Sequence, residues 1–347
     1  MTATRSTTRR TLLAIAKIAL AVAILAYLFV QAREHEAFTR LVNEPKHWPS
    51  LVAGTVCTFT AATLCFLRWH LLIRAVGIPI QLAQTLRLGA LGFALNFVSL
   101  GAIGGDLFRA IFLAHGQPGR RTEAVATVAA DRLLGVMTIA VLASCGILAA
   151  NLLHAPSAQL SLLSKTILVT TALGLVGAAM LLSMPALSGP AISGFARRVP
   201  IAGTTLERLF GTVRAFRNQK RLLAAAAVVS VAANLTYITS FFLVASGLPM
   251  RHPTWAEHLV VVPVASLVGA IPATPAGLGT MELAVNELYL TMPGAAGVRP
   301  GEGAVVTLAH RVTMMAVALV GLVYYLGHRA EVREVYAEAE ELVEAGA

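Results

Sequence analysis

The chain carries little charge for its length. Of its 347 residues only 13% are Asp, Glu, Lys or Arg, whereas an average soluble domain has about 25%. Hydrophobic residues make up 57% of the chain, and its mean hydropathy is +0.74. These proportions exclude a soluble globular domain and predict a multi-pass membrane protein built from α-helices.

Acidic residues are scarcer than basic ones, 17 against 27, which gives a formal net charge of +10. A basic chain can bind nucleic acid, but here the cations stand between apolar runs and have no aromatic stacking platform beside them. We therefore expect no nucleic-acid partner. An anionic membrane lipid is the partner that this charge favours.

Cysteine is also scarce. Cys57, Cys65 and Cys145 all lie inside apolar segments and do not have the spacing of metal ligands. We find no P-loop, no nucleophile with an adjacent base and no metal-ligand cluster, so we predict no catalytic residue, no metal and no cofactor. The expectation is that the chain is not an enzyme.

Six apolar runs are long enough to cross a bilayer, which takes about 20 residues. They cover roughly 11–30, 51–73, 122–152, 166–184, 222–245 and 303–326. At the end of the second run, Arg68, His70 and Arg74 are expected to reach the lipid headgroups. The basic segment 197–221 has helical spacing of its apolar residues and predicts a helix in the membrane interface. The tail 329–347 is acidic and is expected to be solvated.

Two further apolar regions, 83–114 and 258–291, are each divided into two pieces too short to span. Irregular backbone survives at membrane depth only where protein or a wet cavity surrounds it. Each region therefore predicts a re-entrant helical hairpin, although the glycines can also be explained by close helix packing. The breaks contain Gly101, Gly104 and Gly105 in the first region, and Pro272, Pro275, Gly277 and Gly279 in the second.

The distribution of Lys and Arg predicts the orientation, because positive loops stay in the cytoplasm. With a cytoplasmic N-terminus, sixteen of these residues fall on the cytoplasmic side and six on the other. We expect a protein of the cell membrane with both termini in the cytoplasm. The two hairpins then enter from opposite sides, and the chain divides into inverted repeats at 1–152 and 153–328. The predicted fold is all-α, with six spanning helices plus two re-entrant hairpins in an inverted repeat.

Charged residues recur at similar spacings in the two halves. Arg132 follows Asp106 by 26 residues, and Arg311 follows Glu282 by 29. Inverted repeats with broken helices place a substrate site near mid-membrane. Because a guanidinium donates two parallel hydrogen bonds to phosphate and keeps its charge, Arg132, Arg311 and also Arg109 are predicted to bind an anionic lipid headgroup.

The acidic residues have two interpretations. Asp106, Glu282 and Asp131 are predicted to neutralise the arginines of an empty site or to couple turnover to a proton, since an unpaired charge at this depth is costly. The alternative is that Asp131–Arg132 and Asp106–Arg109 are internal ion pairs that only hold helices together.

Four pieces of the chain resemble the flippase-like transmembrane domain of the lysylphosphatidylglycerol synthases, over about Thr11 to Leu326. That resemblance implies translocation of a lipid across the cytoplasmic membrane, which is an aminoacylated phosphatidylglycerol in the best-known members. Ala276 stands where members often have a second glycine. No soluble aminoacyl-transferase domain follows, so synthase activity is not implied. The pieces are Gly104-Gly105-Asp106-x-x-Arg109, Asp131-Arg132-Leu133, Ile271-Pro272-x-Thr274-Pro275-x-Gly277-x-Gly279-x-x-Glu282, and Arg311 in the last helix.

Three functions are consistent with the sequence. The first is a flippase-like or scramblase-like translocator of an anionic phospholipid or a polyprenyl-linked lipid. The second is a non-catalytic membrane partner of a lipid-modifying or cell-wall synthesis enzyme. The third, a membrane transferase acting on lipid phosphate, has the least support because the sequence shows no nucleophile arrangement.

Overall fold

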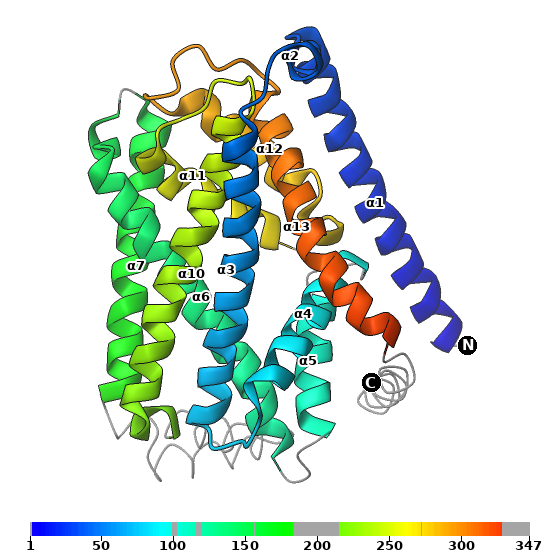
Figure 1. Ribbon diagram of the computed structural model, residues 1–347, viewed down its shortest axis with the longest axis vertical. Helices are drawn as coiled ribbons and strands as arrows, with labels where there is room; N and C mark the ends of the chain where they lie inside the picture. The colour runs from blue at the N-terminus through cyan, green and yellow to red at the C-terminus, as the bar shows by residue number, and fades with distance from the viewer. Residues whose placement is uncertain are drawn as a thin grey trace.

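Six long apolar helices form the framework of the protein (Figure 1). The computed structural model describes residues 2–98, 103–115, 120–155, 157–183, 215–271 and 273–327. Within them each of the six helices is long and apolar enough to cross a membrane, as the sequence predicts. They are α1 (Thr2–Glu34), α3 (Trp48–Ala75), α6 (Arg121–Ala149), α7 (Ala158–Ser183), α10 (Lys220–Gly247) and α13 (Glu302–Gly327).

Two pairs of shorter helices correspond to the two divided regions. The first pair is α4 (Leu82–Val98) and α5 (Ile103–His115). The second is α11 (Trp255–Ala270) and α12 (Thr280–Thr291), with the one-turn helix η3 (Pro275–Gly277) between them. In Figure 1 the first pair lies in the lower half of the molecule and the second in the upper half. The short helices α2 (Ala37–Asn43) and η1 (Leu152–His154) belong to connections.

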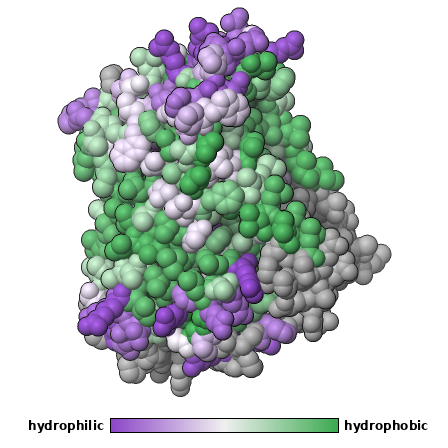
Figure 2. Space-filling view, in the orientation of Figure 1, coloured by the Kyte–Doolittle hydropathy of each residue, from purple (hydrophilic) through white to green (hydrophobic). Residues whose placement is uncertain are grey.

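The surface of the described residues is divided into an apolar band and polar ends. Figure 2 shows hydrophobic residues across the middle of the molecule and hydrophilic residues at the top and bottom. Large apolar side chains on the long helices are exposed, among them Leu173, Val228 and Val323. Exposed apolar residues in such numbers are costly in water but are favourable against lipid. The structure is therefore that of a multi-pass membrane protein.

The antiparallel helices α3 and α10 form the centre of the molecule. Gly54 near the start of α3 lies against Val244 near the end of α10, and Gly247 lies against Leu51. Four other helix contacts form two matching pairs. The contact of α4 with α13 matches that of α11 with α6, and the contact of α5 with α6 matches that of α12 with α13. These are the contacts that an inverted repeat requires, and the repeat itself stays a prediction.

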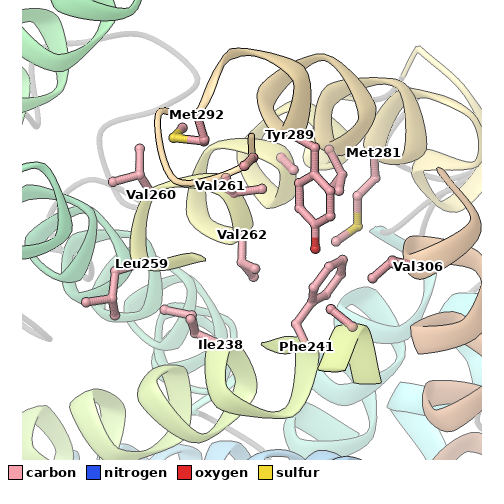
Figure 3. Close-up of a cluster of buried hydrophobic side chains, with 14 of the residues drawn as sticks. Ile238, Phe241, Leu259, Val260, Val261, Val262, Met281, Tyr289, Met292 and Val306 are labelled. Carbon is pink, nitrogen blue, oxygen red and sulfur yellow. The ribbon is translucent and has the colours of Figure 1, made fainter. Parts of the chain in front are cut away.

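Small residues permit the close approach of the short helices to the long ones. A side chain on Gly321 of α13 would overlap the carbonyl group of Ala90 in α4. On the other side, a Cβ on Gly146 of α6 would lie 2.6 Å from the Cβ of Leu259 in α11. Apolar packing then fills the second half, where Phe241, Tyr289 and Met281 point toward one another (Figure 3).

The structure places two of the predicted helix-breaking residues differently, whereas Pro275, Gly277 and Gly279 lie between α11 and α12. Gly104 and Gly105 belong to the first turn of α5 and not to the break before it. The reason is packing: Gly105 lies directly on the carbonyl oxygen of Gly92 in α4, and its N–H donates to Asn96 Oδ1 at 3.0 Å. Pro275 and Gly277 form η3, and Gly279 precedes α12. Some predicted features lie outside the described residues. They are Gly101, Pro272, residues 197–214 of the predicted interfacial helix, and the tail 329–347.

The inverted repeat makes a prediction about topology. In a variant lacking the native cysteines, we expect single cysteines at Arg120, between α5 and α6, and at Pro293, between α12 and α13, to react with a membrane-impermeant thiol reagent from opposite sides. Labelling of intact and permeabilised cells checks this. Reaction of both positions from the same side would contradict the repeat.

Candidate functional site

Arg132 and Arg311 line one cavity of about 310 Å³ at the centre of the molecule. Arg132 is eleven residues after the first residue of α6, and Arg311 is nine after the first residue of α13, which is about 16 Å and 14 Å by helical rise. Both values are close to half the thickness of the hydrocarbon layer, about 30 Å. The cavity is lined from α3, α4, α5, α6, α10, η3 and α13.

Asp106 connects two arginines of the first half. Its carboxylate accepts hydrogen bonds from Arg109, one turn along α5, and from Arg132 on α6. The acidic residue stands in the first turn of α5, where the helix dipole favours negative charge. Arg109 is 7% exposed and its guanidinium lies 5.1 Å from the ring centre of Trp69, whereas the Arg132 side chain is 53% exposed. The first half thus presents one exposed guanidinium to the cavity.

Glu282 has the equivalent place in the second half, in the first turn of α12. It accepts a hydrogen bond from Gly279 N–H at 2.7 Å and thereby caps the helix. Its carboxylate also pairs with Arg311 on α13, and the Glu282 side chain is fully buried. Arg311 in turn donates to the carbonyl oxygens of Ala276 at 3.3 Å and Gly277 at 2.9 Å. The arginine therefore fixes the backbone of η3.

Asp131 lines the cavity but does not pair with its neighbour Arg132. Its Oδ1 accepts from Arg68 Nε on α3 at 2.7 Å. Arg68 also donates a hydrogen bond to Ser230 Oγ on α10 at 2.9 Å, and Thr138 Oγ1 on α6 donates to the same Ser230 Oγ at 3.0 Å. This network connects α3, α6 and α10. The interpretation of Asp131–Arg132 as an ion pair is wrong for this structure. Asp106 does pair with Arg109, but both residues belong to α5, so this pair does not hold two helices together.

Arg68 is the charged residue that sequence reasoning misplaced. Arg68 and His70 were expected at the headgroups together with Arg74, but Arg68 is 6% and His70 is 7% exposed. His70 Nδ1 lies 3.0 Å from Thr85 Oγ1. Arg74 is exposed and six residues further along α3, so Arg68 lies about 9 Å deeper by helical rise. The presence of a second arginine nearer the helix end is the signal that could have placed Arg68 inside.

Ala276 has a backbone conformation that normally requires glycine. Its φ is 51° and its ψ is 25°, in the left-handed region. A side chain there costs about 1–2 kcal/mol because its Cβ approaches the backbone. This explains physically why a glycine often stands at this place of the motif. The strained residue is held by the hydrogen bond from Arg311 to its carbonyl oxygen.

The cavity suits an anion more than a metal ion. Four arginines line it, and Asn96, Asn234 and Tyr237 add neutral polar groups. Arginine cannot ligate a cation, and among the described residues no group of three or more His, Cys, Asp or Glu could hold a metal ion. Guanidinium groups at a partly dry site instead match phosphate or carboxylate.

The two ion pairs predict unequal effects on stability. Replacing Arg311 by Gln leaves the buried Glu282 without its cation, so we expect the free energy of unfolding to fall by about 3–5 kcal/mol. Replacing Arg132 by Gln leaves Asp106 paired with Arg109, so the loss is about 1 kcal/mol or less. Thermal unfolding in detergent measures both, with Arg74→Gln as the control for loss of an exposed charge. Equal losses from the two variants would contradict the assignment.

A second prediction concerns Ala276. Replacing it by Gly relieves the left-handed strain, so we expect the free energy of unfolding to rise by about 1 kcal/mol. The control is Ala226→Gly inside α10, which is expected to lower stability by a similar amount because glycine is unfavourable in a helix. Chemical denaturation in mixed micelles measures the two changes. A destabilising Ala276→Gly would show that the alanine side chain contributes packing that outweighs the strain.

Comparison with known proteins finds similar sequences. The chain is 26% identical over 282 residues to a UPF0104 membrane protein of Methanothermobacter thermautotrophicus, which covers 75% of this chain and 80% of that protein. A family model described as the lysylphosphatidylglycerol synthase TM region matches residues 14–321. That match includes every residue that lines the cavity. The chain therefore belongs to the family of the lysylphosphatidylglycerol synthase transmembrane region.

Proposed function

We propose that the protein translocates a lipid with a phosphate-bearing headgroup between the leaflets of the cell membrane, with both of its termini in the cytoplasm. The observation that carries the proposal is the single cavity lined by an arginine from each half of the chain, Arg132 and Arg311. A headgroup that passes through the hydrocarbon layer needs such a polar binding site at mid-depth, because its charge is energetically costly in lipid.

The carboxylates support this function by neutralising most of the positive charge of the empty site. Asp106 pairs with Arg109 and Arg132, and Glu282 pairs with Arg311. An arginine with no counter-ion would be strongly unfavourable at this depth. A phosphate that enters the cavity binds donors that are already held away from bulk water, so no donor has to be desolvated for it. This keeps the barrier to headgroup entry low.

The apolar surroundings support a lipid in preference to a water-soluble anion. Leu133, next to Arg132 on α6, is 68% exposed, and Val312, next to Arg311 on α13, is 65% exposed. The cavity wall also contains Phe66, Phe93 and Met314. In this arrangement a headgroup lies among the arginines while its acyl chains stay in contact with apolar side chains and lipid.

Reconstitution tests the function. Purified protein in liposomes that contain fluorescent phosphatidylglycerol is expected to make more than half of the dye accessible to an impermeant quencher on the outer leaflet. We expect Arg132→Gln to slow this exchange by about tenfold or more, the loss of one charge-assisted hydrogen bond to phosphate. We expect the paired neutral variant Glu282→Gln/Arg311→Gln to slow it by a similar factor, because the cavity loses the arginine of the second half and the hydrogen bonds that hold η3. Arg74→Gln, which removes an exposed charge at the end of α3, is the matched control.

The outcomes discriminate between functions. Exchange in wild-type vesicles with loss in both cavity variants supports translocation. Conversion of the lipid to a new species, measured by mass spectrometry, would contradict it and favour a transferase. No exchange for labelled phosphatidylglycerol or polyprenyl phosphate would contradict it and favour a membrane partner of another enzyme.

A further inference from the structure

The two arginines of the cavity are not equally available to a ligand. Arg311 donates through Nε and Nη2 to Glu282, through Nη1 to Ala276 and again through Nη2 to Gly277. All three of its nitrogens are therefore engaged, and its side chain is only 12% exposed. Four of its five N–H groups are used in this way, so a phosphate that takes two N–H groups of Arg311 has to break at least one of these hydrogen bonds.

Arg132 has the opposite situation. Its Nε donates to Asp106, but among the described residues nothing accepts a hydrogen bond from its two terminal nitrogens. Its side chain is 53% exposed. Two parallel N–H groups with no acceptor are the geometry with which arginine binds two oxygens of one phosphate.

The charge of the cavity sets the charge of the ligand. The four lining arginines are balanced by three carboxylates in the described residues: Asp106, Asp131 and Glu282. One positive charge is left over, and it belongs to the first half, where Arg109 and Arg132 share Asp106. A ligand with one negative charge therefore neutralises the site, whereas a ligand with more leaves charge uncompensated at membrane depth.

The volume of the cavity suits a small headgroup. A cavity of about 310 Å³ equals the liquid volume of about ten water molecules. It thus has room for a headgroup of about ten non-hydrogen atoms, which is one phosphate with a short polyol or amine.

We propose that Arg132 receives the phosphate of a small, singly negative lipid headgroup, and that Arg311 is a positioning residue that holds the η3 turn. The identity of the ligand as a lipid rests on the proposed function. The unequal roles of the two arginines follow from their hydrogen bonds alone. The expectation that Arg132 and Arg311 both bind the headgroup stays a prediction, and the proposal assigns the two arginines different roles.

Cys65 provides the probe, because it lines the same cavity. In a Cys57→Ala/Cys145→Ala variant in detergent, N-ethylmaleimide labels Cys65, and dihexanoyl phosphatidylglycerol is expected to protect it. The concentration dependence of protection gives Kd. Arg132→Gln is expected to raise this Kd by about tenfold or more, and Arg132→Lys, which keeps the charge but not the planar fork, by less. Arg74→Gln is the matched control with wild-type Kd.

The paired variant Glu282→Gln/Arg311→Gln separates positioning from binding, and it leaves no buried charge unpaired. We expect its Kd to change by about threefold or less while its rate of translocation in liposomes falls by about tenfold or more. If Glu282 and Arg311 had a purely structural role, the paired variant would either keep both its Kd and its rate of translocation or change both together. An increase in Kd as large as that of Arg132→Gln would show that Arg311 also holds the phosphate, and would overturn the proposal.

Other ligands complete the test. Geranyl diphosphate, which carries more negative charge, is expected to protect Cys65 less well than geranyl phosphate, and the reverse order would overturn the charge assignment. Inorganic phosphate at the same concentration is expected to protect weakly, and equal protection would identify a site for free phosphate. Protection by phosphatidylglycerol without translocation would overturn the proposed function but not the site. Translocation without protection would overturn the site alone.

Discussion

The pairing of charge in a medium of low polarity is the constraint on which the centre of this protein depends. Each arginine that lines the cavity has a carboxylate within hydrogen-bonding reach, and each of those carboxylates comes from a different helix or helix turn. Because an isolated charge is so costly at this depth, these pairs determine which helices lie next to the cavity. The apolar packing around them has many acceptable arrangements, whereas the ion pairs have few.

Much of the fold follows directly from hydropathy. The six long helices correspond to six apolar runs, and the two divided regions correspond to two pairs of short helices. The pairs Asp106–Arg132 and Glu282–Arg311 were also accessible from the sequence, since their spacings are similar and each acidic residue begins a short helix. Periodicity and charge suffice here because lipid excludes almost every alternative structure.

Other features depend on contacts that spacing does not reveal. The partner of Asp131 is Arg68, which lies 63 residues earlier in the chain, so no local pattern connects them. Gly104 and Gly105 resemble helix breakers in the sequence, but the close approach of α4 makes glycine necessary inside α5. Arg132 and Arg311 differ in the hydrogen bonds that they make, because backbone carbonyl groups point at the guanidinium of Arg311. Only the three-dimensional structure reveals this difference.

The length of the central pair also sets the depth of the protein in the bilayer. α3 and α10 each have 28 residues, or about 42 Å by helical rise, while the hydrocarbon layer is about 30 Å thick. The pair must tilt or extend into both headgroup layers. Arg74 and Lys220 stand at the same end of the pair, so the antiparallel arrangement brings two cations to the level of one headgroup layer.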